Sequence, residues 1–505
     1  MDTSVINHVI STRPAPGAGI TVIGLGHRTS WSAADFYDQA RAVAGALRRR
    51  GAGPGSRIGI LSANRMEWVL LDLAALMIKA QTAGFEPGKF TPDADLVERY
   101  DLDLLFTDVP LPDDAPPQAV PISIVADHAG EVPADLDPVQ WATTDCTTVK
   151  FTSGSTGVPK GLEATAGSID SSLHAVQGLF GHGPGDDILT FLPLSILQQR
   201  YWLYSALYWG HDLTITTYQS VLAVMSTVRP TVVMGVPAFF DAVRRHIENS
   251  VADGAEPAEA VAEVFGDRIR YLWTGSAPAD RAMLDFYGRA GLEIYEGYGL
   301  NETCIVTKNY PGATREGSVG RALPGKEIII DDDGVVHVRS DFPVNTRYTF
   351  AAPGSSENIF GPGGLVRTGD LGRLDDDGFL YILGRADDVL VLGNGKKIIV
   401  RPVETRFRDT GAVSDCVLYH PSSAGLVAVV SPLPGPVDTG AVSVALADVN
   451  AVSEPDERIV RVIVADEPFT VENGLLTSQF KPVRHRIAHR YSNRIDDPKA
   501  GIRAY

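Results

Sequence analysis

Short apolar runs alternate along the first three hundred residues with segments whose apolar positions recur at helical spacing. Residues 57–61 (RIGIL) are typical of a buried strand, whereas residues 36–47 carry an apolar residue every three or four positions, as one face of a helix does. Ser32 and Asp35 form a capping-box pair that predicts where this helix begins. Further strands are predicted at 104–107, 147–151, 187–194, 231–236, 270–273 and 293–295, and further helices at 66–79, from 168 onward and at 198–209. This alternation predicts an α/β fold with helices on the faces of its sheets.

From residue 327 the pattern changes to strands joined by glycine-bearing turns. Residues 327–330 and 335–338 flank one turn, and a second turn precedes the strand expected at 379–383. The polar, glycine-flanked stretch 384–388 is a candidate domain boundary. Beyond it, strands are predicted at 413–419, 426–430 and 459–464, and a basic helix at 482–490. The end of the chain is therefore expected to form a small α+β domain.

The composition is that of a soluble globular enzyme of more than one domain, with 505 residues, 44% hydrophobic and 21% charged. The net charge of −18 argues against nucleic-acid or anionic-membrane binding. Three widely spaced cysteines, Cys146, Cys304 and Cys416, fit a reducing cytoplasm rather than a disulfide framework or a zinc site. Neither a signal peptide nor an apolar run long enough to span a membrane is visible, so we expect a cytoplasmic protein.

The most distinctive segment is residues 152–161 (TSGSTGVPKG), between the strand at 147–151 and the helix from Ser168. Its glycines let backbone N–H groups turn toward an anion, its hydroxyls add donors, and Lys160 adds a positive charge. The spacing differs from the common P-loop, because Gly157 is followed by valine and proline before the lysine. We predict a phosphate loop of another kind; the alternative is a mobile surface loop rich in Gly, Ser and Thr.

Glycine-bearing loops also follow three later strands, at the positions where parallel sheets place ligands. The strand at 231–236 runs into Pro237, and the segments 275–278 (GSAP) and 297–302 (GYGLNE) follow the next two strands. These loops are expected to face one crevice.

The chain resembles the adenylate-forming enzymes, a family that includes acyl-CoA synthetases, peptide-synthetase adenylation domains and luciferases. The motifs that carry the resemblance are residues 152–161, YGLNE at 298–302, GSVGRALPG at 317–325, RTGD at 367–370, GRADD at 384–388 and the lysine motif at 473–481. They occur in the family's order over nearly the whole chain. Residues 192–200 (LPLSILQQR) and 230–241 look most like long-chain acyl-CoA synthetases.

The resemblance implies that a carboxylate attacks the α-phosphate of ATP, and that a thiol, usually coenzyme A, then displaces AMP from the acyl adenylate. The residues expected to hold the β- and γ-phosphates are Thr152, Ser153, Ser155, Thr156 and Lys160. Glu302 is expected to hold Mg²⁺, a hard cation that prefers oxygen ligands. Lys481 is expected to bridge the acyl carboxylate and the α-phosphate, and Asn301 occupies the position of a catalytic hydroxyl.

The residues that the resemblance assigns to the nucleoside are Gly275, Ser276, Ala277, Pro278, Tyr298, Gly299, Asp370 and Arg385. Tyr298 is expected to stack on adenine against the 275–278 wall, and Asp370 to accept both ribose hydroxyls. Taken singly, an Asp, Glu or Lys is usually a solvated surface residue, and Tyr298 is compatible with an ordinary core tyrosine. These assignments therefore depend on the whole set of motifs.

The resemblance also implies a fold and its motion. It predicts a large domain at 1–385, made of α/β sheets plus a β-barrel-like part, and a small mobile domain at 386–505. The small domain is expected to rotate about Asp387 between the two steps, and Gly395 to let the thiol arm of coenzyme A pass. The expected acyl pocket contains Ile196, Val236, Trp273 and Gly297. The aromatic segment 201–209 suggests a bulky hydrophobic acid, although a core helix is the usual reading of such a segment.

Three positions depart from the family pattern. Asn301 stands where the family usually has threonine, and Ala166 and Ile196 stand where related synthetases often carry histidine. Loss of one donor to a transition-state anion costs about 3 kcal/mol, so we expect adenylation to be affected more than thioester formation. The first hypothesis is an acyl-CoA ligase for a hydrophobic acid, and a variant of it is an enzyme that mainly converts a supplied acyl adenylate to the thioester. The alternatives are loading of an acyl carrier protein and a non-catalytic adenylate-binding protein.

Overall fold

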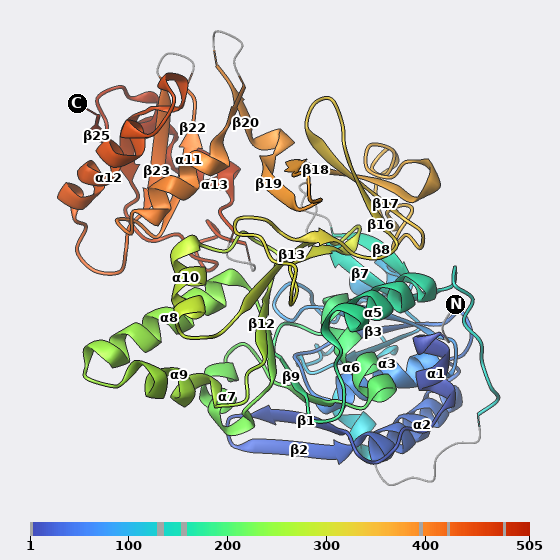
Figure 1. Ribbon diagram of the computed structural model, residues 1–505. Coiled ribbons are helices and arrows are strands. Elements are labelled where there is room, and N and C mark those ends of the chain that lie inside the picture. The colour runs from blue at the N-terminus through green and yellow to red at the C-terminus, as the bar shows by residue number, and fades with distance from the viewer. Residues whose placement is uncertain are drawn as a thin grey trace. The chain divides into compact units, whose positions relative to one another are not determined.

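Two sheets of mainly parallel strands form the framework of the first three hundred residues (Figure 1). The larger sheet has the order β15-β14-β13-β12-β11-β9-β10-β1-β2, and the smaller has the order β6-β5-β3-β4-β7-β8. The strands of the larger sheet are β1 (Gly19–Gly24), β2 (His27–Ser32), β9 (Asp187–Thr190), β10 (Asp212–Ile215), β11 (Val232–Gly235), β12 (Tyr271–Thr274), β13 (Ile294–Leu300), β14 (Cys304–Lys308) and β15 (Arg321–Ala322). Those of the smaller sheet are β3 (Arg57–Leu61), β4 (Gln81–Phe85), β5 (Leu104–Thr107), β6 (Ala119–Pro121), β7 (Cys146–Thr152) and β8 (Lys160–Thr165).

This computed structural model describes residues 4–128, 136–152, 159–392, 397–421, 425–477 and 481–504, with the backbone alone at 387, 391 and 397. The chain divides into two compact units. The first contains residues 1–275, 286–329 and 337–367, and the second contains residues 276–285, 330–336 and 368–505. The division at residue 385 that the motifs suggested stays a prediction.

In the described part of the chain, ten α-helices and two 3₁₀ segments lie between residues 5 and 364. They are α1 (Val5–Ser11), α2 (Ala33–Arg49), α3 (Met66–Met77), α4 (Ala94–Arg99), η1 (Ile122–His128), α5 (Ala166–Phe180), α6 (Leu197–Trp209), α7 (Val221–Val228), α8 (Pro237–Ala252), α9 (Pro257–Phe265), α10 (Arg281–Arg289) and η2 (Pro362–Gly364). The expected cap of α2 is confirmed, because the Ser32 side chain accepts a hydrogen bond from the Asp35 backbone N–H at 3.0 Å. Helix α5 begins two residues before the predicted start, with Thr165 as its cap.

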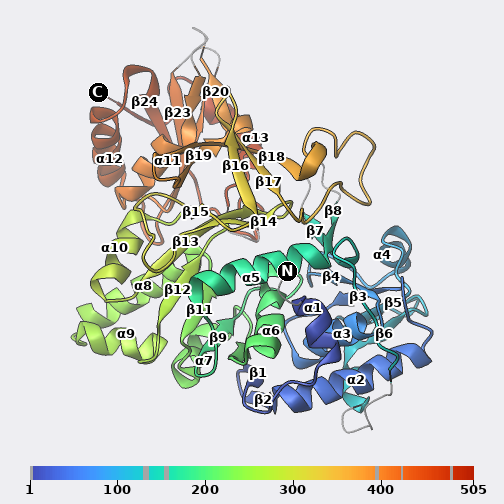
Figure 2. The same cartoon turned by 45° about the vertical axis from the view of Figure 1, so that its right-hand side comes forward.

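One apolar core extends over helices α1, α3, α5 and α6 and reaches strands of both sheets. Helix α1 contacts α3, α5 and α6, and both views of the ribbon show it among them (Figures 1 and 2). Helices α7, α8 and α9 lie on the other side of β9, β11 and β12 from α6 (Figures 1 and 2). The aromatic segment predicted from residue 198 is confirmed as a buried helix, α6.

A buried ion pair lies inside this apolar core. Arg200 of α6 donates to Asp72 of α3 at 3.1 Å, and the two side chains are 0% and 1% exposed. The same Arg200 nitrogen donates to the hydroxyls of Thr82 on β4 and Thr148 on β7, at 3.2 and 2.9 Å. Tyr204 donates to the second Asp72 oxygen at 2.5 Å. The pair thus joins a helix that follows the larger sheet's β9 to two strands of the smaller sheet.

A four-stranded sheet with the order β16-β17-β18-β19 follows in the chain, and it contains the predicted hairpins. Its strands are β16 (Lys326–Ile330), β17 (Val335–Ser340), β18 (Leu365–Leu374) and β19 (Leu380–Arg385). Strand β18 is longer than expected and includes the RTGD motif, which faces β19 with Asp370 opposite Arg385.

The end of the chain forms the predicted α+β arrangement around the sheet β22-β23-β24-β25. Its elements are η3 (Ala386–Asp388), β20 (Val389–Val391), β21 (Lys397–Ile399), α11 (Val400–Asp409), β22 (Asp415–Tyr419), β23 (Leu426–Ser431), α12 (Thr439–Ala451), η4 (Pro455–Glu457), β24 (Ile459–Val464), α13 (Arg484–Asp496) and β25 (Ile502–Arg503). One face of the sheet packs on α11 and α12, and the other packs on α13. Alternating strand residues fill these two cores, as the period of a strand requires.

In the described part of the chain, no helix combines the length and the apolar character that a membrane crossing requires.

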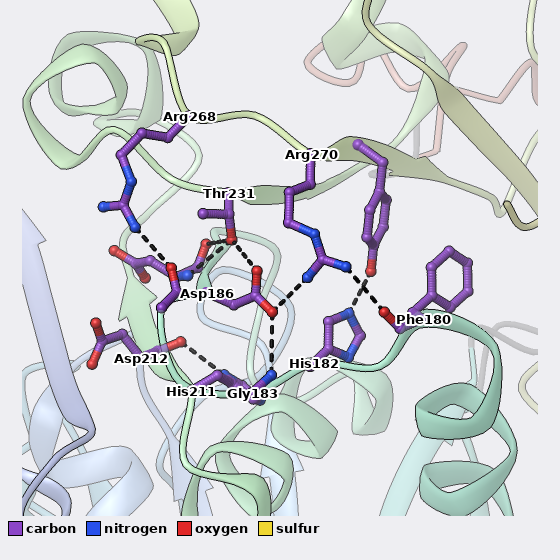
Figure 3. Close-up of polar contacts among 12 residues, drawn as sticks. Phe180, His182, Gly183, Asp186, His211, Asp212, Thr231, Arg268 and Arg270 are labelled. Carbon is purple, nitrogen blue, oxygen red and sulfur yellow. Dashed lines mark hydrogen bonds and ion pairs between the residues drawn. The ribbon is translucent and has the colours of Figure 1, made fainter.

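A buried polar cluster lies at the amino ends of β9–β12 (Figure 3). Arg270 donates to Asp186 at 2.5 Å, and Thr231 donates to the other Asp186 oxygen at 3.1 Å. His182, 3% exposed, shares a hydrogen bond of 2.5 Å with the Tyr271 hydroxyl. Burial, helped by nearby His211, lowers the pKa of His182 to about 3, so the ring is neutral in the folded protein.

We predict that His182→Gln makes folding less sensitive to acid. Between about pH 6.5 and pH 3 the unfolded chain binds a proton at His182 that the folded chain does not, so this residue lowers wild-type stability as pH falls through that range. Asp187 has the opposite effect on stability, because burial raises its pKa to about 6. Between about pH 6 and pH 4 the folded chain binds a proton at Asp187 that the unfolded chain does not, so this residue raises stability as pH falls. Comparing variant with wild type isolates His182, since Asp187 is present in both.

The measurement is the urea midpoint of both proteins from pH 7 to pH 4. The variant should be less stable at pH 7 by about 1 kcal/mol, because the bond to Tyr271 is weakened, and the gap should close or reverse in acid. His246→Gln, on the exposed side of α8, is the matched control and should show no such trend. A gap that stays constant with pH contradicts the prediction.

Candidate active site

The carboxyl ends of β9, β11, β12 and β13 lie at one edge of the larger sheet, because these strands are parallel neighbours. The four residues expected in the acyl pocket lie in these strands or in the segments that follow them. Ile196 and Val236 precede α6 and α8 as their N-cap residues, Trp273 lies in β12, and Gly297 lies in β13. Sharing an edge is what the loop positions predicted; the pocket role of the four residues stays a prediction.

The predicted phosphate loop connects the antiparallel strands β7 and β8. Thr152, the last residue of β7, is opposite Lys160, the first residue of β8. Both ends of the loop are therefore held by a strand pair. Ser153, Ser155 and Thr156 lie outside the described residues.

Tyr348 connects Lys160 to Glu302. The Lys160 ammonium lies 4.7 Å from the centroid of the Tyr348 ring, and the Tyr348 hydroxyl donates to Glu302 Oε1 at 2.7 Å. Asn345 donates to the Glu302 backbone carbonyl at 3.2 Å. Two residues assigned separately from their motifs, one to the phosphates and one to the metal, are thus close in space.

Neither Asn345 nor Tyr348 was predicted as a site residue. Both lie in the irregular stretch between β17 and β18, where no strand or helix period marks a buried or functional face. The segment is held on the first unit by backbone bonds between Thr349 and Gly161, at 2.8 and 2.9 Å, and by Phe350 against Tyr100. No motif within the stretch could have identified the two residues.

Asn301 and Glu302 lie in the tight turn between β13 and β14. The sequence predicts a loop that begins at Gly297, four residues before this turn. The difference arises because Gly297–Leu300 pairs with β14 across a bulge after Tyr298. Gly299 is required here, since a Cβ at this position would lie 1.9 Å from the Cys304 carbonyl oxygen. The turn leaves Asn301 exposed and Glu302 half-buried.

The expected adenine wall is divided between the two units. Gly275 belongs to the first unit and approaches the Gly297 carbonyl, whereas Ser276, Ala277 and Pro278 belong to the second. Ser276 adopts a left-handed φ of 69°, a conformation that non-glycine residues rarely take. Stacking of adenine between this wall and Tyr298 stays a prediction.

The second unit brings together Asp370, Arg385 and Lys481. Asp370 is 5% exposed, and Arg385 donates to its Oδ1 at 3.3 Å and to the Thr368 carbonyl at 2.9 Å. Lys481 keeps solvent-accessible surface, but the protein atoms around it lower its pKa, and the positive charge of Arg401 lowers it further. Asp370 acts in the opposite direction, which favours the charged lysine.

Comparison with known proteins identifies the family. The model of the AMP-binding enzyme family matches residues 13–340, which is more than half of the chain. The chain belongs to the AMP-binding enzyme family. The predicted membership among adenylate-forming enzymes is confirmed.

Curated relatives and solved structures agree with this assignment. The long-chain-fatty-acid–CoA ligase FadD15 of Mycobacterium tuberculosis is 27% identical, covering 93% of this chain and 92% of the relative. The o-succinylbenzoate CoA synthetase MenE of Bacillus subtilis, solved with its acyl-adenylate intermediate, is similar in structure with a TM-score of 0.78, 21% identity and 99% coverage of each chain. ATP-bound MatB of Rhodopseudomonas palustris gives a TM-score of 0.80 at 20% identity, with 98% of this chain and 100% of that chain covered. The predicted fold class, two α/β sheets with a barrel-like part and a small α+β region, is confirmed.

The hinge assignment of this AMP-binding enzyme is described only in part. The backbone of Asp387 lies in the short 3₁₀ segment η3, and its side chain and Gly395 lie outside what the structure describes. The next residue, Asp388, pairs with Arg484 of α13 at 3.3 Å, and Arg484 also pairs with Glu404. The hinge position is therefore adjacent to an ion-pair network inside the second unit.

The three departures from the family pattern occupy different settings. Ala166 is the first residue of α5 and is 1% exposed, so its methyl group is buried. Ile196 is half-buried and Asn301 is exposed. Of the three, Asn301 alone carries a side chain able to donate a hydrogen bond.

Glu302 is chemically suited to a magnesium ion. Mg²⁺ is usually held by one or two carboxylates together with waters and substrate phosphates, rather than by a cage of protein ligands. One Glu302 oxygen accepts from Tyr348, which orients the carboxylate and leaves further lone pairs for a cation. Within the described ranges, no group of three or more His, Cys, Asp or Glu side chains forms a second candidate.

We predict that Tyr348→Phe weakens magnesium-dependent ATP binding by about tenfold. The substitution removes the hydroxyl that orients Glu302 but keeps the ring beside Lys160, and a hydrogen bond to a charged group is worth about 1.5–3 kcal/mol. Titration calorimetry with ATP at graded Mg²⁺ concentrations measures the effect without requiring turnover. Tyr381→Phe is the matched control, because it removes a hydroxyl that donates to the carboxylate of Asp375 at 3.1 Å elsewhere. Equal ATP affinity and Mg²⁺ dependence in wild type and Tyr348→Phe would refute the orienting role.

Proposed function

We propose that this AMP-binding enzyme is an acyl-CoA ligase that activates a hydrophobic carboxylic acid as its adenylate. The observation that carries the proposal is the link from Lys160 through Tyr348 to Glu302. Lys160 is the first residue of β8, directly after the predicted phosphate loop. Such a site offers a positive charge and a carboxylate for a cation, which suits a nucleoside triphosphate. The names of the curated relatives, long-chain-fatty-acid–CoA ligases, support the acid and the acceptor.

In the first half-reaction a carboxylate oxygen of the acid attacks the α-phosphorus of ATP, and the bond to the pyrophosphate oxygen breaks. Two anions must meet, so catalysis depends on neutralising charge and on positioning. Thr152 and Lys160 hold the terminal phosphates, and Lys481 neutralises the carboxylate and the α-phosphate. Mg²⁺, when bound at Glu302, supplies further positive charge to the phosphates.

Asp370 and Arg385 hold the ribose. A carboxylate can accept hydrogen bonds from both ribose hydroxyls, and Arg385 fixes the orientation of Asp370 by donating to Oδ1. Tyr298 and the 275–278 segment enclose the adenine, and Gly299 lets the β13–β14 turn close beside it.

In the second half-reaction the coenzyme A sulfur attacks the acyl carbonyl carbon, the thiol proton is lost, and AMP leaves. Lys481 is no longer needed, so rotation of the small domain about Asp387 removes it and admits the thiol past Gly395. The ion pair of Asp388 with Arg484 keeps the chain beyond the hinge joined to α13 during this motion.

We propose further that adenylation is the weaker half. Asn301 presents an amide where the family has a hydroxyl, and Ala166 and Ile196 present apolar side chains where related synthetases present imidazoles. These positions flank the phosphates and the acid, whereas the residues of the second step keep the family pattern.

We predict that the enzyme makes thioester from a pre-formed acyl adenylate faster than from free acid. Mass spectrometry would follow thioester formation in two arms: one with acid, ATP, Mg²⁺ and coenzyme A, the other with acyl adenylate and coenzyme A. Asn301→Thr should raise pyrophosphate release in the first arm by about tenfold or more, because a hydroxyl donor to the α-phosphate is restored. It should leave the second arm unchanged.

Equal rates in both arms would show a complete ligase in which the departures are tolerated, and no gain from Asn301→Thr would contradict the role given to Asn301. Product in neither arm contradicts transfer to coenzyme A, and the same adenylates are then offered to a phosphopantetheinyl carrier protein. Binding of adenylates without any transfer would identify a non-catalytic protein.

We predict that Lys481→Ala separates the two half-reactions. Pyrophosphate release should fall at least about a hundredfold, because the charge that stabilises the attacking carboxylate and the α-phosphate is lost. Thioester formation from the pre-formed adenylate should stay within a few-fold of the parent. The parent is wild type or Asn301→Thr, whichever releases pyrophosphate measurably, and Lys499→Ala, an exposed lysine of the second unit, is the control. An equal loss in both half-reactions contradicts the assignment.

A further inference from the structure

Positive charge is in excess around one buried carboxylate of the second unit. Asp370 is 5% exposed and accepts a hydrogen bond from Arg385 at 3.3 Å. Two further basic side chains, Arg401 and Lys481, lie within its electrostatic reach, and Asp370 is the carboxylate that acts most strongly on each of them. Arg401 is half-buried and Lys481 is exposed, so solvent reaches this group. Arg385 and Lys481 have proposed roles, whereas Arg401 has none.

Two glycines show where these basic side chains lie. A Cβ at Gly369 would lie 2.8 Å from Arg385 Nη2, so the Arg385 guanidinium covers the backbone of the RTGD motif. A Cβ at Gly384, the residue before Arg385 on β19, would lie 3.6 Å from Arg401 Cβ. The first turn of α11 therefore packs on β19 next to the residue that bonds to Asp370.

Among the described residues, Arg401 takes part in no hydrogen bond or ion pair. The two nearby carboxylates, Asp388 and Glu404, pair with Arg484 instead. Burial lowers the pKa of Arg401, because its charge is poorly solvated there. An arginine in the first turn of a helix also meets the positive end of the helix dipole. An anion bound beside Arg401 would offset each of these costs.

We propose that Arg401 binds the phosphate group of the nucleotide whose ribose Asp370 holds. This inference rests on the proposed function and adds a binding residue to its nucleotide site. Ribose and phosphate are adjacent groups of the nucleotide, and the start of α11 is adjacent to the bond between Arg385 and Asp370, so one bound molecule can reach both. A guanidinium can donate two parallel hydrogen bonds to phosphate oxygens. A phosphate bound there also relieves the repulsion between Arg401 and Lys481.

The test compares AMP with adenosine, which differ by the phosphate alone and bind without turnover. In titration calorimetry, Arg401→Met should weaken AMP at least about tenfold, because hydrogen bonds between two charged groups are lost. Its affinity for adenosine should change by less than about twofold, since the ribose and adenine contacts remain. Arg401→Lys keeps the charge without the planar fork and should retain part of the affinity for AMP.

A matched variant and a third ligand complete the design. Arg458→Met removes an exposed arginine of the same unit and should leave both affinities unchanged. Coenzyme A also carries phosphates, and it should bind equally to wild type and Arg401→Met if the arginine serves the nucleotide. Thermal unfolding of each variant without ligand monitors the fold.

Three outcomes overturn the inference while the ligase proposal stands: an unchanged affinity of Arg401→Met for AMP, an equal loss for AMP and adenosine, or a loss confined to coenzyme A. The second outcome makes Arg401 a structural support of β19 only, and the third assigns it to the phosphates of the thiol substrate. Failure of wild type to bind AMP at all overturns the proposed function, and this inference with it.

Discussion

The buried pair of Arg200 and Asp72 is the constraint on which the core of the first unit depends. It places a charged bond between α6 and α3 and extends it through Thr82 and Thr148 to two strands of the smaller sheet. Removing one partner of such a pair leaves an uncompensated buried charge, which costs about 3–5 kcal/mol. The pair therefore ties α6 to β7, the strand that leads into the predicted phosphate loop.

The residues predicted for the site belong to two compact units of the chain. Within the first, Tyr348 connects Lys160 and Glu302, the residues proposed for the terminal phosphates and for the metal ion. Within the second, Asp370, Arg385 and Lys481 form a charged group that suits the ribose and the reacting carboxylate. This division suits a reaction with two half-steps, because one unit can retain the adenylate while part of the other brings and removes a lysine.

Most elements could be predicted because their signals are local. Strands such as β3 and β5 have the predicted bounds, and the Ser32 cap marks the start of α2 as expected. Errors arose where pairing with a distant strand decides the structure. Residues 297–300 carry turn-forming glycines, yet they continue β13 because β14 pairs with them across a bulge. Glycine marks a close approach here rather than a loop, and the partner that approaches is not visible from the segment itself.

The order of the motifs along the chain was sufficient to predict the fold class and the family and to name Lys160, Glu302, Asp370 and Lys481 as candidates, because each motif is a short local sequence that resembles one of the family's. Contacts between segments distant in sequence were not accessible in this way. Tyr348 meets Glu302 across 46 residues within an irregular stretch, and Lys308 reaches Thr274 across 34. Such contacts follow from packing, which brings side chains together according to the shape of the whole core, and a lysine in a strand gives no sign of whether its ammonium will reach water or two backbone carbonyls.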